Sequence, residues 1–302
     1  MKRFLIFLIL FSFRLHATEE KTIHVEEKYS KGSWTEYTSS DELNLKRLIE
    51  LLSKSKTGDR ILKEARFKAA STGHTLIDVI KIGEGSLTDT TLVRKFSPAS
   101  PDNVIYESRS VVYLNRHLTW DDALLDLAHE LTHFVYREAF NPYAESFNAK
   151  DFIKGTIEGS GGEVQAFLTE CKVLKELFSS KVQGRSHCQK IEDSEGQLSF
   201  SKAVELFYHV GNYYDSMDKK LSEKNLQSAD FNLKADKINF ISSAYGVPYP
   251  VAALMEYELV LSKVCENDKK RIAYVQQGQK RGPASVGSDK LLQSYKTRCS
   301  IK

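Results

Sequence analysis

Hydrophobic positions recur along this chain with the period of a helix in most segments and with the period of a strand in two. From Asp41, the residues Leu45, Leu48 and Leu52 share one helical face, which predicts a helix over 41–52. The same spacing predicts further helices at 59–70, 120–140, 164–179, 200–221, 229–245 and 250–266. Runs rich in β-branched residues predict strands at 75–82 and 110–115. The pattern therefore predicts a mostly helical α+β fold with a small β-sheet beside the helix 120–140.

Segments rich in polar residues, glycine or proline separate these elements. A loop is predicted at 97–101, and Asn141 and Pro142 are expected to end the helix 120–140. Residues 143–156 are interpreted as a connecting segment, and the basic, glycine-containing stretch 269–290 as a mobile loop.

The first residues have the three parts of a secretory signal peptide. Lys2 and Arg3 are basic, residues 4–13 are apolar, and Ala17 is a small residue at the expected cleavage position. An apolar run of this length is too short to span a bilayer, which takes about 20 residues in a helix. We therefore expect a secreted or periplasmic protein with no stable membrane insertion after signal cleavage.

Charge and cysteine content narrow the class of protein further. The net charge is only +3, and basic residues are interspersed with acidic ones, which argues against nucleic acid as the main partner. Four cysteines are an even number, so an exported chain is expected to pair them. The pairs Cys171–Cys188 and Cys265–Cys299 each close a short loop and are the favoured connectivity. Metal binding by cysteine is the weaker alternative, because C-x-x-C spacing is absent.

The predicted helix 120–140 contains the sequence His129-Glu130-Leu131-Thr132-His133, an H-E-x-x-H motif. Residues four apart lie above one another on a helix, so the two imidazoles can bind one zinc ion while Glu130 stands beside them. An apolar stripe falls on the other side of the helix and leaves the histidines facing a cleft or water. Thr119 and Asp122 are a helix-capping pair. The alternative is a solvated polar face that carries two histidines by chance.

A downstream carboxylate completes the candidate site. In the predicted helix that follows Gly161 and Gly162, Glu163 lies on the apolar stripe, where a carboxylate is unfavourable unless it is paired or binds a metal. Glu163 is therefore the predicted third ligand. Glu158, in the glycine-rich loop, is the competing candidate. Glu170 is either an acceptor for one histidine or an ordinary acid at the flank of the helix.

An H-E-x-x-H motif followed by a glutamate at the start of a second helix resembles the gluzincin branch of the zincin metallopeptidases. The resemblance covers about 110–178 and implies that His129, His133 and Glu163 bind Zn²⁺ and that Glu130 is the general base. The third histidine of the metzincins is absent after His133. Phe167 stands where thermolysin-like enzymes have an aspartate that orients a ligand histidine, which leaves the acceptor for that histidine open.

On this interpretation the chain has four parts: a signal peptide at 1–17, a polar leader at 18–40, N-terminal helices with the small sheet and the metal-binding helices at 41–180, and a helical C-terminal part at 181–302. The loop 245–250 could line the cleft, and the aromatic residues at 207–209 and 213–214 are where a group that stabilises an oxyanion is sought. The strand 110–115 either runs beside the metal, with an edge open to a peptide, or is a core strand.

The expected function is that of an exported zinc metallopeptidase, which hydrolyses a peptide or protein substrate with Glu130 as general base. One alternative is a secreted, zincin-like binding protein with little or no catalytic activity. Another is a zinc hydrolase that acts on cell-wall peptides or on a bond other than a peptide bond.

Overall fold

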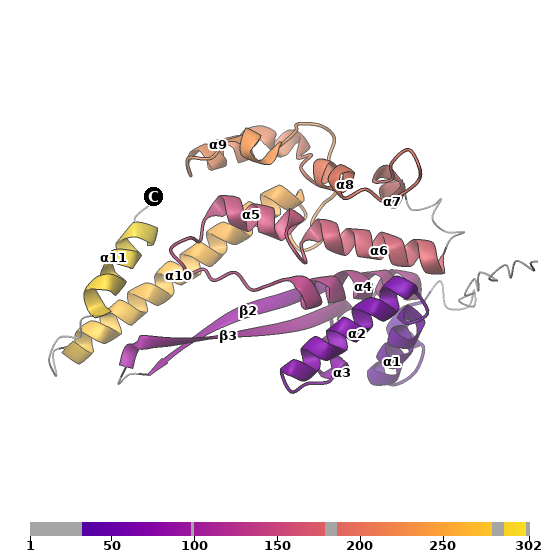
Figure 1. Ribbon diagram of the computed structural model, residues 1–302, viewed down its shortest axis with the longest axis horizontal. Coiled ribbons are helices and arrows are strands. Elements are labelled where there is room, and N and C mark those ends of the chain that lie inside the picture. Colours follow the sequence, from indigo (N-terminus) through magenta and orange to yellow (C-terminus); the bar gives the residue numbers. More distant parts are fainter. Residues whose placement is uncertain (1–31, 98–99, 179–185, 280–286, 300–302) are drawn as a thin grey trace, which may run out of the picture.

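The computed structural model of the chain describes residues 32–97, 100–178, 186–279 and 287–299. It has the predicted α+β class, with many helices and one small sheet (Figure 1). The helices are α1 (Asp41–Leu52), α2 (Lys56–Ser71), α3 (Leu76–Val79), α4 (Trp120–Tyr136), α5 (Ala149–Glu158), α6 (Glu163–Leu177), α7 (Ser186–Lys190), α8 (Phe200–Phe207), α9 (Tyr214–Ser222), α10 (Tyr249–Gln279) and α11 (Gly287–Cys299). Short 3-10 turns are η2 (Trp34–Glu36), η4 (Gly211–Tyr213) and η5 (Ser228–Phe231).

The sheet has three strands in the order β1-β3-β2, so β3 is central and β2 lies at an edge. The strands are β1 (Ile80–Gly83), β2 (Leu87–Ser97) and β3 (Ser100–Asn115). β1 is parallel to β3, whereas β2 and β3 form a long antiparallel hairpin that runs beside α10 in Figure 1. The predicted strand 110–115 is the end of β3 and is a core strand. β2 was not predicted, because its polar residues show no apolar face.

The strand predicted at 75–82 is wrong for its first half, which forms the short helix α3. Thr75 and Asp78 form a capping box, in which each side chain accepts a hydrogen bond from the backbone of the other, and this starts the short helix α3. Only Ile80 to Gly83 pair with β3. A local side-chain cap therefore overrides the β propensity of the first residues.

The part of the predicted polar leader (18–40) that the structure describes packs onto the fold. The Trp34 side chain is fully buried, its indole Nε1 donates to the carbonyl of Asn115 (2.8 Å), and its backbone N–H donates to that of Leu118 (3.0 Å). This segment therefore packs against the connection between β3 and α4. The predicted signal peptide and its cleavage site lie outside the described residues.

Helix α4 forms the centre of the molecule and contacts α1, α2, α6, β2 and β3. It begins as predicted, with the Thr119 side chain accepting from the N–H of Asp122. Its apolar stripe is buried, including Leu124, Leu127 and Leu131. It ends at Tyr136 rather than at 140, because Arg137 takes an extended backbone and its side chain turns toward the start of α6.

The C-terminal half differs most from the prediction. The segment 143–156 includes most of α5, the predicted helix 200–221 is split into α8 and α9, and 229–245 is mostly irregular. The last of these is fixed by backbone bridges such as His209 with Lys234, which periodicity does not reveal. The helix 250–266 is the first part of α10, which runs on to Gln279 through much of the predicted mobile loop 269–290.

Both predicted disulfides are present. Cys171–Cys188 joins α6 to α7, and Cys265–Cys299 joins α10 to α11. Two disulfides are typical of proteins from oxidising compartments. Within the described ranges, no helix is both long enough and apolar enough to cross a membrane.

A buried cluster of charged side chains fastens the β2–β3 hairpin to the C-terminal helices. Asp268 of α10 accepts from Arg94 of β2 (2.7 Å) and from Arg298 of α11 (3.0 Å), and its side chain is 2% exposed. The Arg94 guanidinium also lies 3.6 Å from the centre of the Tyr143 ring, and Arg298 donates to the Tyr143 carbonyl. Strand β2 and helix α10 are therefore held together near Arg94 and Asp268.

We expect Asp268→Asn to lower the free energy of unfolding by about 3–5 kcal/mol, because it leaves two buried guanidinium groups without a compensating charge. Urea unfolding of the disulfide-bonded protein measures this. Glu266→Gln on the same helix is the control, since its pair with Lys270 is exposed to solvent and contributes little to stability. Equal stability of the two variants would contradict the structural role assigned to Asp268.

Candidate metal centre

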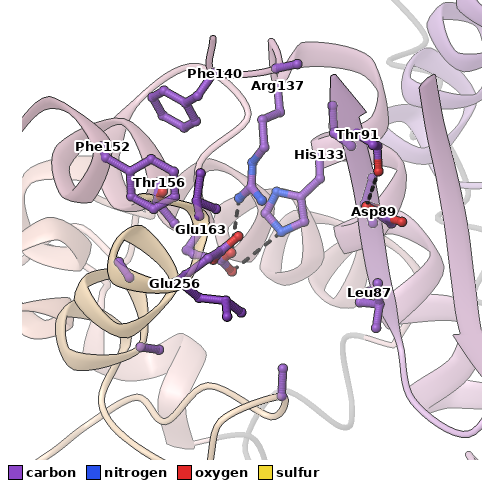
Figure 2. A pocket seen from close by; sticks show the side chains of 18 of the residues that line it. Leu87, Asp89, Thr91, His133, Arg137, Phe140, Phe152, Thr156, Glu163 and Glu256 are labelled. Atoms are coloured by element: carbon purple, nitrogen blue, oxygen red, sulfur yellow. Dashed lines mark hydrogen bonds and ion pairs between the residues drawn. The ribbon is translucent and has the colours of Figure 1, made fainter. Parts of the chain in front are cut away.

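A cleft of about 690 Å³ lies between β2, the second half of α4, the start of α6 and one face of α10 (Figure 2). β2 contributes residues 87–92 to its lining, and α10 contributes residues spaced three and four apart from Tyr249 to Asn267. Tyr245 and Tyr249 belong to the loop 245–250, which was expected to line a cleft and does so. His129, Glu130, His133 and Glu163 also face this space.

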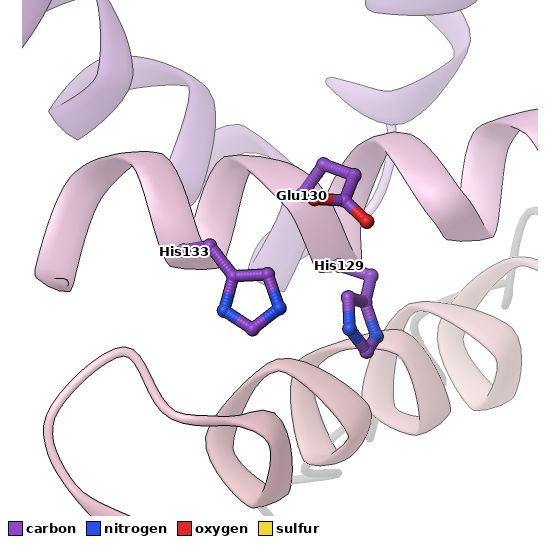
Figure 3. Close-up of side chains that lie close together, drawn as sticks. All are labelled: His129, Glu130 and His133. Atoms are coloured by element: carbon purple, nitrogen blue, oxygen red, sulfur yellow. The ribbon is translucent and has the colours of Figure 1, made fainter. Parts of the chain in front are cut away.

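The H-E-x-x-H residues form a compact group on α4. Figure 3 shows both imidazole rings projecting from the same side of the helix, with Glu130 further round. Potential ligand atoms of His129, Glu130 and His133 all lie within 4.8 Å of one another, so the group could hold a metal ion. The histidines face the cleft rather than bulk water, and the His133 side chain is only 4% exposed.

Glu163, the first residue of α6, reaches both histidines. Its Oε2 atom lies 3.4 Å from His129 Nε2 and 3.5 Å from His133 Nε2. Ligand atoms around a tetrahedral zinc ion, each about 2.0–2.2 Å from the metal, lie roughly 3.3–3.6 Å apart. Its other oxygen, Oε1, accepts from Arg137 (3.0 Å), which fixes the carboxylate. The distances from Glu163 Oε2 to the two imidazole nitrogens therefore match those between ligand atoms that share one metal ion.

The far nitrogen of each imidazole has an acceptor. His133 Nδ1 lies 2.7 Å from the Gly161 carbonyl, and His129 Nδ1 lies 3.4 Å from Glu170 Oε2. A carbonyl oxygen only accepts, so Nδ1 of His133 carries a proton and its Nε2 can offer a lone pair to the cleft. Of the two roles considered for Glu170, the structure favours that of an acceptor for a histidine. Gly161 was not predicted, because a backbone carbonyl leaves no signal in residue types.

The charges around the histidines favour a cation. Burial alone would lower the pKa of His129, but contacts with Glu163 and Glu170 outweigh it and raise that pKa well above its usual value. Burial would likewise raise the pKa of Glu163, yet His133, His129 and Arg137 hold it well below the usual range. Glu163 is thus ionised, and positive charge beside it is stabilised.

Glu130 is held from the edge strand. The Thr88 hydroxyl of β2 lies 2.7 Å from Glu130 Oε2 and 2.9 Å from the Glu130 backbone carbonyl. A hydroxyl has a single proton, so it donates to one of these oxygens at a time. The carboxylate is therefore oriented beside the histidines by a residue that sequence analysis missed, because β2 itself was missed.

Other candidate residues lie elsewhere. Glu158, the competing third ligand, ends α5 and accepts from the Tyr208 hydroxyl (3.1 Å) instead of lining the cleft. The residues at 207–209 and 213–214 do not line the cleft either.

Tyr249 lines the cleft. Burial, together with the charges of Glu163 and Glu130, raises the pKa of its hydroxyl well above the usual value. Tyr249 therefore stays protonated and can donate a hydrogen bond.

Gly161 places its carbonyl by a left-handed backbone conformation that favours glycine. Its φ is +64°, and a Cβ added there would lie 2.3 Å from the backbone nitrogen of Arg137. The same carbonyl accepts from His133 and from Arg137 Nε (3.1 Å). The close approach of this loop to the end of α4 therefore sets the orientation of one histidine and of the arginine that binds Glu163.

We expect Gly161→Ala to weaken binding of a divalent metal about 10- to 100-fold, because its carbonyl must move away from His133. Calorimetric titration of the metal-free protein with zinc measures the affinity. Gly73→Ala is the matched control: its φ is +79°, but nothing lies within 4 Å of the added Cβ. Unchanged affinity in a folded Gly161→Ala protein would contradict this role.

We compared the chain with models of known protein families, with curated protein sequences and with solved structures, and none of the three comparisons gives a match.

Proposed function

We propose that this protein is an exported zinc-dependent metallopeptidase, with His129, His133 and Glu163 as the zinc ligands and Glu130 as the general base. The observation that carries the proposal is the position of Glu163 Oε2, 3.4 and 3.5 Å from the two Nε2 atoms. Two imidazoles and one carboxylate are the donor set of a catalytic zinc site, in which one further position stays open.

When bound, zinc supplies an acidified water molecule and a Lewis acid for a carbonyl oxygen. Glu130 removes the proton from the attacking water and returns it to the leaving amine. Thr88 holds the Glu130 carboxylate in place for both transfers. The protonated Tyr249 hydroxyl, on the α10 wall, is the group we assign to the developing oxyanion.

The edge strand suggests how a peptide lies in the cleft. Among the described residues, β2 pairs with β3 on one side and has no strand on the other, and its residues 87–92 line the cleft beside Glu130. An extended peptide can add to such an edge through main-chain hydrogen bonds, which brings its carbonyl groups past the histidines. We therefore assign to β2 the peptide-binding edge that sequence analysis considered for the strand 110–115.

Two further features support the proposed catalytic activity and the proposed export of the protein from the cytoplasm. Glu130 is retained, buried and hydrogen-bonded beside the histidines, which favours turnover over the alternative of a binding protein. The two disulfides and the predicted signal peptide agree with a secreted or periplasmic site of action.

Glu130→Gln is expected to keep the zinc content of the wild type and to lose about 100- to 10,000-fold in peptide hydrolysis, because the amide cannot accept the proton. Mass-spectrometric profiling of a peptide library, together with zinc analysis, measures both. Glu50→Gln, on the exposed face of α1, is the control. A fully active Glu130→Gln protein would exclude this mechanism.

Glu163→Ala is expected to lower zinc affinity sharply, because it removes the only ligand on α6 and leaves Arg137 facing the two histidines. Glu158→Ala is the comparison and should bind zinc like the wild type, since Glu158 contacts Tyr208. Zinc titration against a competing chelator ranks the three proteins. If Glu158→Ala lost zinc and Glu163→Ala did not, the ligand assignment would be wrong.

A further inference from the structure

A single acidic side chain interrupts the face of α10 that lines the cleft. Its neighbours on this face include Ala252, Ala253 and Val260, which are apolar. Glu256 lies among them, and in Figure 2 it is on the same side of the cavity as Glu163. In the part of the chain that the structure describes, Glu256 has no hydrogen-bonding or ion-pair partner, although it is not exposed.

The cations that line the cleft are engaged with other acids. Arg137 binds Glu163 and the Gly161 carbonyl. Lys263, two turns further along α10, lies 3.8 Å from Glu266. Neither of them neutralises Glu256 by direct contact.

The opposite wall adds negative charge. Asp89 of β2 faces the cleft across from α10 in Figure 2, and its carboxylate accepts from the Thr91 hydroxyl (3.0 Å). Burial raises the pKa of Glu256; Arg137 opposes that shift, while Glu163 and Asp89 add to it. A carboxylate that is partly removed from water and left without a partner is unfavourable, and a cation placed between the two walls relieves this.

We propose that Glu256, with Asp89 opposite it, makes the cleft selective for substrates that carry a positively charged ammonium or guanidinium group. This inference rests on the proposed peptidase function and names the substrate class for the same cleft. Because most of the α10 wall is apolar, one well-placed carboxylate is enough to orient a ligand and to discriminate between ligands. The cation can come from a lysine or arginine side chain or from a free peptide N-terminus.

The test uses short alanine-based peptides with one lysine, arginine, glutamine or norleucine, each made with a free and with an acetylated N-terminus. Cleavage is measured with the zinc-loaded wild type and with Glu256→Gln. Binding is measured by fluorescence anisotropy with Glu130→Gln, alone and combined with Glu256→Gln, so that affinity is read without turnover. Glu50→Gln, on the exposed face of α1 away from the cleft, is the control.

We expect cationic peptides to be preferred over their neutral counterparts, and Glu256→Gln to reduce that preference about 10- to 100-fold while cleavage of neutral peptides stays within about twofold. A preference that survives acetylation assigns the cation to a side chain, whereas one that acetylation abolishes assigns it to the N-terminus. A preference in binding without any cleavage supports the role of Glu256 and rejects the peptidase function. The inference is overturned if no charge preference is found in either measurement, or if Glu256→Gln leaves the preference unchanged.

Discussion

The candidate site depends on the approach of α4 and α6 at one point. The histidines come from the middle and end of α4, and Glu163 is the first residue of α6. The Gly161 turn allows the loop before α6 to touch the end of α4, where its carbonyl holds both His133 and Arg137. Arg137 in turn binds Glu163. One steric condition, the absence of a Cβ at Gly161, thus fixes the orientation of a histidine and of the carboxylate that faces it.

The cleft is built by elements on either side of that contact. β2 supplies one wall and places Thr88 against Glu130, and α10 supplies the other wall with Tyr249 and Glu256. At the far end of both walls, Asp268 of α10 binds Arg94 of β2 and also Arg298 of α11, beside the Cys265–Cys299 disulfide. The H-E-x-x-H group therefore sits in a cleft whose two walls are joined by a buried ion pair, while the disulfide fastens α11 to the α10 wall. Rigid support of this kind suits a site that must hold several groups in register.

Local signals in the sequence were enough for the parts of the site that lie on regular helices. The four-residue spacing of His129 and His133, the cap at Thr119 and the acid on the apolar stripe of α6 each have a local physical cause, and the structure brings these residues together. The two cysteine pairs were predicted because each closes a short loop.

The parts of the site that sequence analysis missed depend on tertiary contacts. β2 is a polar edge strand stabilised by pairing with β3, and the Gly161 carbonyl is a backbone group that residue types do not reveal.

The most direct test of this account is a crystal structure of the zinc-soaked protein in which anomalous diffraction at the zinc edge locates the metal. The account predicts one strong peak in the cleft, about 2.0–2.2 Å from Nε2 of His129, Nε2 of His133 and a carboxylate oxygen of Glu163. Zinc bound only elsewhere, or a peak in the cleft that Glu163 does not contact, would contradict it.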